Sequence, residues 1–275
     1  MTNKKTALIT GATGGIGSEV AKNLDALGYH LILLGSNIIR TQALADKMQS
    51  AEAIACDLVN PAGVQNLCEQ IDRLSPPLDI AFINAGIISP GDILDCSTSD
   101  INRMLEINFC SAIHIIKACA SNMQRQKSGH IIASVSMGGI LSLKGSATYS
   151  ATKFGLRGFL TSIKDELKPH DIKVSGLYPG GVDTPMLRQE MKDGGSALNF
   201  INPPAAVEDI SNAFFKALKT GKLEVYSPYF DSVFARVMNS FPWMLSPLYP
   251  LLEWLGQKGK KKYSKRISQS FQENE

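Results

Sequence analysis

TALITGATGGIG, at residues 6–17, is a short apolar run that stops at a glycine-rich turn. The residues that follow, 16–27, carry apolar side chains at the spacing of a helix, and residues 31–34 form a second apolar run. A strand, a glycine-rich turn, a helix and a strand in this order predict a βαβ unit. Units of this kind build parallel sheets, because the crossover helix brings both strands to run in the same direction.

The same alternation continues along the 275-residue chain. Further strands are predicted at residues 53–55, 80–83, 130–135, 173–177 and 223–226. Further helices are predicted at residues 40–50, 61–74, 99–126 and 148–167, and within 204–218. Seven strands alternating with helices predict a single doubly wound α/β domain around a seven-stranded parallel sheet. We expect this domain at residues 1–227 and an amphipathic, basic, helical tail at 228–275.

Composition excludes several classes of protein. A net charge of +3 gives no electrostatic basis for binding nucleic acid. The five cysteines include no C-x-x-C pair and the four histidines no H-E-x-x-H motif, so we expect a reducing compartment and no metal site. No apolar run is long enough to span a bilayer, and the first apolar run predicts a strand rather than a secretory signal. A cytoplasmic protein is therefore expected.

The glycine-rich turn has the residues that a dinucleotide phosphate site needs. Gly11 can make the tight turn, Gly15 leaves room for phosphate groups, and Gly17 allows the helix to pack closely. The helix N-terminus behind the turn offers free N–H groups and the positive end of a dipole to an anion. The G-x-x-x-G-x-G spacing differs from the commoner G-x-G-x-x-G, and a plain tight turn is the alternative reading.

A second motif, Y-x-x-x-K, places Tyr149 and Lys153 on one face of the helix predicted at 148–167. A phenol has a pKa of about 10, which is too high for an efficient base at neutral pH. A nearby ammonium group favours the phenolate, so we expect Lys153 to lower the pKa of Tyr149. In isolation, such a pair is more often a packing tyrosine and a surface lysine.

Together these motifs resemble the short-chain dehydrogenase/reductase family over about residues 6–184. The residues that carry the resemblance are the glycine loop, Asp57, Asn84-Ala85-Gly86, Asn108, Ser136, Tyr149, Lys153, and Pro179-Gly180 with Val182 and Thr184. Ile83 departs from the family pattern, which has a second asparagine before the N-A-G turn. The resemblance implies a Rossmann domain that binds NAD(P) and an oxidoreductase that moves hydride between nicotinamide and a carbonyl or alcohol.

The resemblance also implies a role for each matching residue. Tyr149 would exchange the proton, and Lys153 would adjust the pKa of Tyr149 and hold the ribose. Ser136 would orient the carbonyl, and Asn108 would anchor water in a proton path. Cofactor contacts are implied at Gly11, Thr13, Gly15, Ile16, Gly17, Ser36, Asp57, Leu58, Asn84, Ala85, Gly86, Tyr149, Lys153, Pro179, Gly180, Val182 and Thr184. Ser134 is the alternative serine, and Asn108 and Asp57 have structural alternatives as a helix bridge and a turn cap.

The end of the second strand bears on the choice of cofactor. An acidic residue there would bind the ribose 2′-hydroxyl of NAD and repel a 2′-phosphate. Gly35 stands at that position, Ser36 could donate to a phosphate, and Arg40 could reach it. The glycine loop lacks the basic residue that phosphate-selective relatives often carry. We expect NADP(H) to be preferred, with NAD(H) as the alternative.

Apolar residues predict the character of the substrate. Residues 137–144 and 185–202, together with Cys96, should line the substrate side. Their apolar members are Met137, Ile140, Leu141, Leu143, Met186 and Leu187. They predict a hydrophobic carbonyl or alcohol substrate, with ordinary core packing as the alternative. Residues 186–200 are expected to form a mobile lid with Gly194-Gly195 as its hinge.

The tail is apolar and aromatic up to Leu255 and basic from Lys258 to Arg266. This order resembles an interfacial membrane anchor, and its three prolines argue against a spanning helix. A tail packed over the pocket, or against a second subunit, is the alternative.

The long helices at 99–126 and 148–167 imply, by resemblance, a homodimer or homotetramer. Two other functions remain open: a dinucleotide-binding sensor without catalysis, and an NAD-dependent oxidant of lipid or steroid alcohols.

Overall fold

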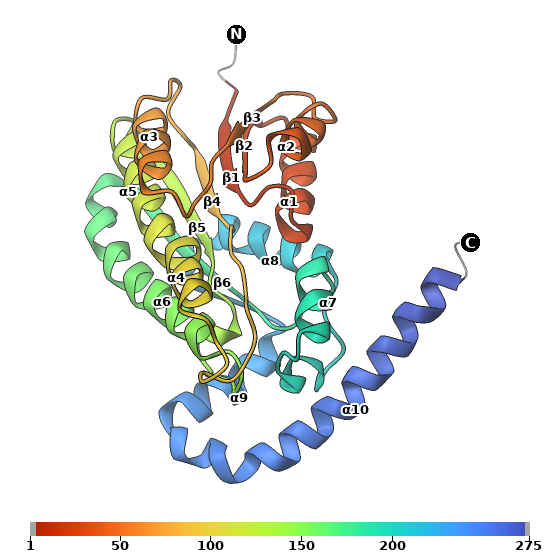
Figure 1. The fold of residues 1–275 in the computed structure, drawn as a ribbon. Coiled ribbons are helices and arrows are strands. Elements are labelled where there is room, and N and C mark those ends of the chain that lie inside the picture. Colours follow the sequence, from red (N-terminus) through yellow and green to blue (C-terminus); the bar gives the residue numbers. More distant parts are fainter. Residues whose placement is uncertain (1–3, 273–275) are drawn as a thin grey trace.

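The computed structural model describes residues 4–272 and forms one parallel sheet covered by helices on both faces (Figure 1). The strands are β1 (Thr6–Thr10), β2 (His30–Gly35), β3 (Ala51–Ala55), β4 (Ile80–Ile83), β5 (Gly129–Ser134), β6 (Ile172–Pro179) and β7 (Glu224–Ser227). Their order across the sheet is β3-β2-β1-β4-β5-β6-β7, and every pairing is parallel. The predicted doubly wound α/β fold with seven parallel strands is confirmed.

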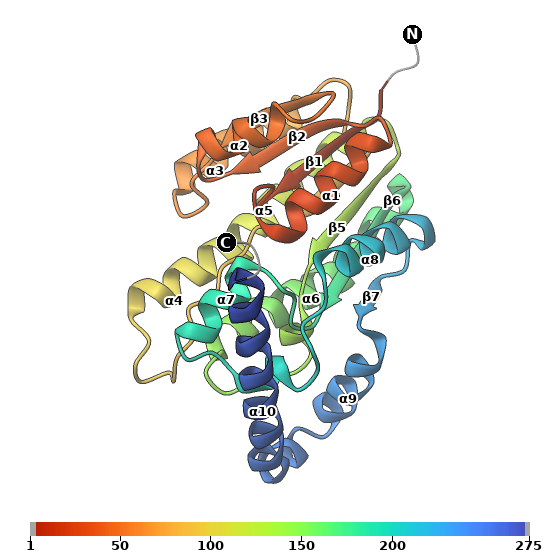
Figure 2. The ribbon, with the colours of Figure 1, turned by 90° about the vertical axis from the view of Figure 1, so that its right-hand side faces the viewer.

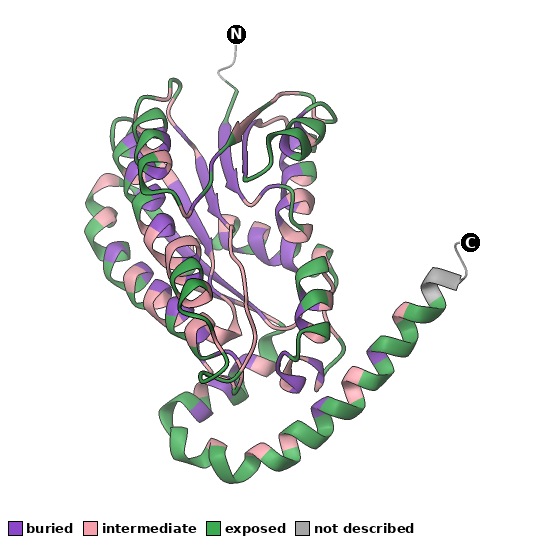
Figure 3. Cartoon of the chain, in the orientation of Figure 1, coloured by how far each residue is buried: buried purple, intermediate pink, exposed green. Residues whose placement is uncertain are grey.

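Helices connect the strands and extend the chain beyond the sheet. They are α1 (Gly15–Ala26), α2 (Ile38–Ala45), α3 (Pro61–Asp72), α4 (Thr98–Leu105), α5 (Ser111–Gln124), α6 (Ala147–Leu167), α7 (Pro185–Lys192), α8 (Val207–Thr220), α9 (Tyr229–Ser240) and α10 (Leu245–Gln272). Short helical turns lie at η2 (Met137–Gly139), η3 (Lys168–His170), η4 (Ala197–Phe200) and η5 (Pro242–Met244). The inner strands β1, β2, β4, β5 and β6 are largely buried on both faces, which is why they read as apolar runs in the sequence, whereas the edge strands β3 and β7 are partly exposed (Figure 3).

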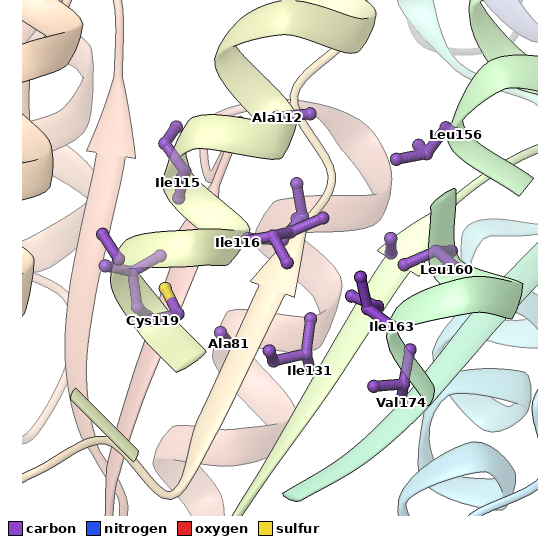
Figure 4. Close-up of a cluster of buried hydrophobic side chains, with 14 of the residues drawn as sticks. Ala81, Ala112, Ile115, Ile116, Cys119, Ile131, Leu156, Leu160, Ile163 and Val174 are labelled. Atoms are coloured by element: carbon purple, nitrogen blue, oxygen red, sulfur yellow. The ribbon is translucent and has the colours of Figure 1, made fainter. Parts of the chain in front are cut away.

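Each face of the sheet has its own apolar core. On one face, α3, α5 and α6 pack against the central strands, and on the other α1 and α8 do so. Figure 4 shows part of the first core, with side chains from α5 and α6 lying over β4, β5 and β6. The labelled members are Ala81, Ala112, Ile115, Ile116, Cys119, Ile131, Leu156, Leu160, Ile163 and Val174. This packing holds α6, which carries the Y-x-x-x-K motif, firmly against the sheet.

The prediction of one uninterrupted α-helix at 99–126 is wrong for the middle of that range. A π-helical segment, η1 (Glu106–Cys110), separates α4 from α5. The wider π turn inserts a residue into the helical register and redirects the side chains around it. Asn108 lies in this segment and is only 1% exposed. Its Oδ1 accepts from the backbone nitrogen of Ile87 and its Nδ2 donates to the backbone oxygen of Ile87, both at 2.8 Å.

Smaller differences concern where elements begin and end. The helix predicted at 40–50 is α2, which begins at Ile38 because the Asn37 side chain caps it by accepting from the backbone nitrogen of Arg40. In the same way Asn60 caps α3, with Pro61 as its first residue. Both caps are residue types that favour this position.

The tail forms α9, η5 and α10, which together curve around one end of the molecule (Figures 1 and 2). α10 continues through Pro250, although a proline inside a helix removes one of its backbone hydrogen bonds. Within residues 4–272, no helix combines the length and apolar character required to cross a bilayer. The division of the chain into units at 1–227 and 228–275 stays a prediction, and its outermost residues, 1–3 and 273–275, lie outside the described part.

Candidate active site

The predicted site residues gather at one edge of the sheet. Most of them follow a strand at its carboxyl end: the glycine loop after β1, Ser36 after β2, Asp57 and Leu58 after β3, Asn84 to Gly86 after β4, Ser136 after β5, and Pro179 to Thr184 at and after β6. Tyr149 and Lys153 reach the same edge from α6. In open parallel sheets, ligands bind in the crevice at this edge.

The glycine loop and the loop after β4 are held together. The Thr10 hydroxyl accepts hydrogen bonds from the backbone nitrogens of Asn84 and Ala85, at 2.9 and 3.0 Å. Gly11 has a φ of +62°, and a Cβ there would lie 2.9 Å from the Cα of Ala85. Gly11 therefore supplies both the left-handed turn and the close approach that the sequence predicts.

The N-terminus of α1 is open to an anion. Gly14 occupies its N-cap position, and no side chain in the described part of the chain caps this helix. Gly17 packs so closely that a Cβ would run into the backbone oxygen of Gly11. Since the first N–H groups of a helix lack partners within it, this uncapped turn fits the diphosphate of a dinucleotide. A Cβ on Gly15 would lie 3.0 Å from Cγ2 of Thr184, so the loop after β6 borders the same space.

Tyr149, Lys153 and Ser136 come together as predicted from their spacing. Lys153 is 4% exposed, and its Nζ lies 5.6 Å from the centre of the Tyr149 ring. Ser136 lies beside Tyr149 and lowers the pKa of its phenol. Nζ of Lys153 donates to the backbone oxygen of Ser134 at 2.9 Å, which fixes the direction of the lysine. The three groups can therefore act on one substrate oxygen and its proton.

The structure distinguishes the two candidate serines. Ser134 donates from its hydroxyl to Oδ1 of Asn84 at 2.9 Å, so it links β5 to the loop after β4. Ser136 has a φ of +97°, which is unusual for a residue with a side chain. Its hydroxyl accepts from the backbone nitrogen of Gly138 at 3.1 Å while facing Tyr149. Backbone strain of this kind is often found where a side chain must be aimed at a reacting group.

Burial sets the proton affinities of the pair. It raises the pKa of Tyr149 to about 12. Ser136 opposes this rise by a smaller lowering of the same pKa, and Glu190 adds to the rise. It also lowers the pKa of Lys153 to about 8. Burial of the phenol therefore opposes the lowering that is expected from Lys153, because removal from water disfavours the phenolate. That lowering stays a prediction.

Asn108 holds the loop after β4. Besides its two bonds to Ile87, its Nδ2 approaches Oγ1 of Thr152 on α6 at 3.4 Å. A Cβ on Gly86 would lie 3.3 Å from Oδ1 of Asn108 and 3.6 Å from Nζ of Lys153. Asn108 thus makes the contacts of a structural bridge, which is the alternative to a role in proton transfer. Its place in a proton path stays a prediction.

The edge expected to face the cofactor ribose is open. Ser36, Arg40 and Asp57 are exposed there, and Leu58 is buried beside them. A Cβ on Gly35 would meet Oγ1 of Thr41. The backbone at this position therefore leaves little room for a side chain, and no carboxylate lies at the end of β2. Asp57 accepts from the backbone nitrogen of Val59 at 3.1 Å. This contact is the one expected if Asp57 caps a turn, which is the alternative to a contact with the cofactor.

The segment predicted as a lid contains α7, a turn with Gly194 at φ +85°, and η4. Thr184 caps α7 by accepting from the backbone nitrogen of Leu187 at 3.3 Å. Leu187 and Phe200 are buried with Tyr263 of α10. The lid segment is therefore covered by the tail, and its mobility stays a prediction.

Two of the predicted pocket residues belong to the core instead. Ile140 is fully buried, and Leu187 packs under α10. Met186 is exposed, and Met137 and Leu141 are partly buried at the border of the core. The alternative of ordinary packing therefore holds for Ile140 and Leu187.

Glu190 is the residue that the sequence reasoning missed. It is 7% exposed on α7, and its Oε1 accepts from Nδ2 of Asn199 at 2.7 Å. Burial raises its pKa to about 7, against lowering by Asn199 and by Lys260 of α10. Its position three residues after Leu187 places it on the inward face of α7, which is the one signal that the sequence offers.

Comparison with known proteins agrees with this geometry. Residues 5–194 match the family described as short chain dehydrogenase. A 3-oxoacyl-(acyl-carrier-protein) reductase of Rickettsia bellii is 32% identical over 213 residues, covering 76% of this chain and 87% of that protein.

Two solved structures share the fold. A short-chain dehydrogenase from Sphingobium yanoikuyae, in complex with NADPH, has a TM-score of 0.77 at 22% identity. A short chain dehydrogenase/reductase from Burkholderia phymatum, in complex with NAD, has a TM-score of 0.77 at 20% identity. Each alignment covers 88% of this chain and 95% of the other. With the match to the family, the strand order and the meeting of Ser136, Tyr149 and Lys153, these findings show that the chain is an oxidoreductase belonging to the short chain dehydrogenase family.

Proposed function

We propose that this chain is an NADP(H)-dependent oxidoreductase that reduces the carbonyl of a hydrophobic substrate, or oxidises the corresponding alcohol. The observation that carries the proposal is the convergence of Tyr149, Ser136 and buried Lys153 beside the uncapped N-terminus of α1. A proton-transfer group and an anion site at one sheet edge suit a reaction that combines proton transfer with a bound dinucleotide.

The chain's own residues fit that cofactor, which supplies the hydride when bound. The glycine loop from Gly11 to Gly17 would hold the diphosphate, and Lys153 with Tyr149 the nicotinamide ribose. Asp57, Leu58 and Asn84 to Gly86 would border the adenosine side. Pro179, Gly180, Val182 and Thr184 would fix the nicotinamide ring, because they lie on the loop that meets Gly15.

The preference for NADP(H) rests on the end of β2. With Gly35 in place of a carboxylate, nothing there repels a 2′-phosphate, and Ser36 and Arg40 are exposed to bind one. The NADPH complex from Sphingobium yanoikuyae and the NAD complex from Burkholderia phymatum share this fold equally well, so the preference rests on Gly35, Ser36 and Arg40.

Tyr149 is the group that exchanges the proton. With a pKa of about 12 it is a neutral phenol at neutral pH, so it can give its proton to a carbonyl oxygen of the substrate. The Ser136 hydroxyl donates to the same oxygen, and Lys153 stabilises the phenolate that forms. The reaction in the direction of reduction therefore begins from the protonation state that burial favours.

The substrate class rests on the apolar residues Met137, Leu141, Leu143 and Met186 near the site. A 3-oxoacyl thioester reductase among the relatives supports a hydrophobic acyl or ketone substrate. By the same family likeness we propose a homodimer or homotetramer built through α4, α5 and α6, which line one side of the molecule (Figure 1). Its cysteine usage favours the cytoplasm.

The test follows NADPH absorbance with a panel of 3-oxoacyl thioesters, steroids and simple ketones. Tyr149→Phe should lower kcat/KM by at least about a thousandfold, because the proton donor is lost while the ring remains. NADPH binding, measured by its fluorescence, should stay within about threefold of the wild type. Tyr29→Phe, far from the site, is the matched control.

Retained turnover in Tyr149→Phe would refute the assigned role. Tight NADPH binding without turnover on the whole panel would favour the sensor without catalysis.

A further inference from the structure

We propose that the exposed face of the tail docks this chain on a membrane surface that contains anionic lipids. The tail surface is defined by its exposed apolar residues: Tyr229, Phe230, Val233, Phe234, Val237, Phe241, Trp243, Met244, Leu248, Leu251, Trp254 and Leu255. They lie on α9, η5 and the first half of α10, at the curved end of the molecule seen in Figures 1 and 3. The inference goes beyond the proposed reaction and does not depend on it.

α9 has one buried face and one exposed face. Ser232, Ala235 and Met238 are at most 5% exposed and face the protein. Phe230 is 85% exposed, and Val237 on the same side of the helix is 45% exposed. A helix that stabilised only the fold would turn polar residues to this side. The outward stripe of α9 is instead apolar, and so it needs a partner or a lipid surface to cover it.

α10 shows the same division along a longer element. Its inward face contains Gly256, Gly259 and Tyr263, which pack against η4 and α7. Leu251 and Trp254 are turned away from this face and are exposed by 56 and 53%, and Leu255, at the border of the packed face, is 38% exposed. The buried side shows that α10 is fixed to the protein, so its outward side is a built surface and not a detached segment.

Basic residues continue the outward side of α10. Lys258, Lys262 and Lys265 follow Leu251 and Trp254 at intervals of three, four or seven residues, which keeps them on one side of the helix. Nζ of Lys258 lies 3.5 Å from the centre of the Trp254 ring. Aromatic and apolar side chains beside lysines are the arrangement that places rings at the lipid headgroups and charges on the phosphates.

Charge favours a bilayer over a second copy of this chain as the occupant. Residues 228–272 contain seven basic side chains and only two acidic ones, Asp231 and Glu253. A two-fold pairing through the tail surface would bring like-charged segments of two copies close together. Anionic headgroups instead complement the lysines while the acyl boundary covers the aromatic rings.

The chain has a native probe for this contact. Its two tryptophans, Trp243 and Trp254, both belong to the tail surface and are 68 and 53% exposed. Adding vesicles of phosphatidylcholine mixed with phosphatidylglycerol to the full chain should shift the tryptophan emission to the blue. Brominated acyl chains in the same vesicles should quench it. Vesicles of phosphatidylcholine alone should bind at least about tenfold more weakly, because they lack the anionic headgroups that attract the lysines.

Matched variants separate the two parts of the surface. Leu251→Asp and the double variant Lys258→Glu/Lys262→Glu should each weaken sedimentation with anionic vesicles by at least about tenfold. Leu27→Asp, at an equally exposed leucine after α1, and Lys216→Glu/Lys219→Glu on α8 should bind as the wild type does.

Equal binding by all variants, or no blue shift with anionic vesicles at low salt, overturns the proposal. So does a molar mass in solution, measured by light scattering, that falls by half in Leu251→Asp, because a second copy would then cover the surface.

Discussion

At the scale of single residues, burial sets the charge of the site. Tyr149, Lys153 and Glu190 each have a pKa moved by burial toward the neutral form. Glu190 is buried on α7, and its negative charge raises the pKa of Tyr149 further. Glu190 is in this way coupled electrostatically to Tyr149.

Glu190 should make stability depend on pH. Its pKa is about 7 in the folded chain and 4.5 as a free side chain, so the folded state binds the proton more tightly. This contribution is fully present below pH 4.5 and is lost as pH rises through 7. Glu190→Gln stays neutral and keeps an oxygen for Asn199. Between pH 5 and 8 the wild type should lose on the order of 3 kcal/mol of unfolding free energy relative to this variant.

Urea denaturation at several pH values measures that difference. His130 and the other titrating groups are common to both proteins, so their effects cancel in the comparison. Glu208→Gln, at an exposed carboxylate on α8, should follow the wild-type profile. Parallel profiles for Glu190→Gln and the wild type would show that Glu190 titrates as an exposed carboxylate does.

Gly35 should control the choice between cofactors. Gly35→Asp introduces a carboxylate that repels a 2′-phosphate, so kcat/KM with NADPH should fall by about a hundredfold or more relative to NADH. Because a Cβ at this position meets Oγ1 of Thr41, the variant is compared with Gly35→Asn, which has the same size and no charge. If both variants lose NADPH and NADH activity equally, the effect is steric and the end of β2 does not read the phosphate.

At the scale of elements, the sequence predicts most of what periodicity and glycine placement determine. Most strands are apolar runs, and the helices have apolar residues at helical spacing. The predicted presence and order of these elements are therefore correct, including the parallel sheet. The π segment around Asn108 follows from a tertiary requirement, the backbone of Ile87, and no local pattern indicates it. Ser136 and Tyr149 were placed by spacing, whereas Glu190 acquires its character only when α10 covers α7.

The contact between α10 and η4 depends on glycine. A Cβ on Gly259 would run into the backbone oxygen of Phe200, whereas a Cβ on Gly158 of α6 has open space around it. Gly158→Ala should therefore raise the unfolding free energy by up to about 1 kcal/mol, as expected within a helix. Gly259→Ala should lower it by about 1–3 kcal/mol, because the two elements must separate.

Denaturant unfolding compares the two variants, and hydrogen exchange locates the change. In Gly259→Ala the backbone amides of α10 should exchange faster, while those of α6 should not. A stabilising effect of Gly259→Ala as large as that of Gly158→Ala would show that α10 is not packed on η4.

At the scale of the whole molecule, the tail joins the two loops that border the site. Tyr249 accepts from the backbone nitrogen of Lys144 at 3.1 Å, in the loop between Ser136 and Tyr149. Tyr263 donates to Oδ1 of Asp183 at 2.6 Å, in the loop after β6. Residues far apart in the chain are thus connected across the region proposed to hold nicotinamide and substrate.

Tyr263 should act as a positioning residue for the loop that contains Val182 and Thr184. Asp183 also accepts from Nε and Nη2 of Arg188, so Tyr263→Phe removes one of three donors and leaves no carboxylate unpaired. A hydrogen bond to a carboxylate is worth about 1.5–3 kcal/mol, and only part of it is transmitted to the loop. The KM for NADPH should therefore rise about three- to tenfold, with kcat within about twofold of the wild type.

Steady-state kinetics in the absence of lipid measures this effect separately from membrane docking. Tyr249→Phe should change the KM less, because the Lys144 N–H it leaves is exposed and water can replace the lost acceptor. A general loss of folding would lower kcat in step with the active fraction and leave the KM unchanged. An unchanged KM in Tyr263→Phe at full kcat would mean that α10 covers the loop after β6 without positioning it.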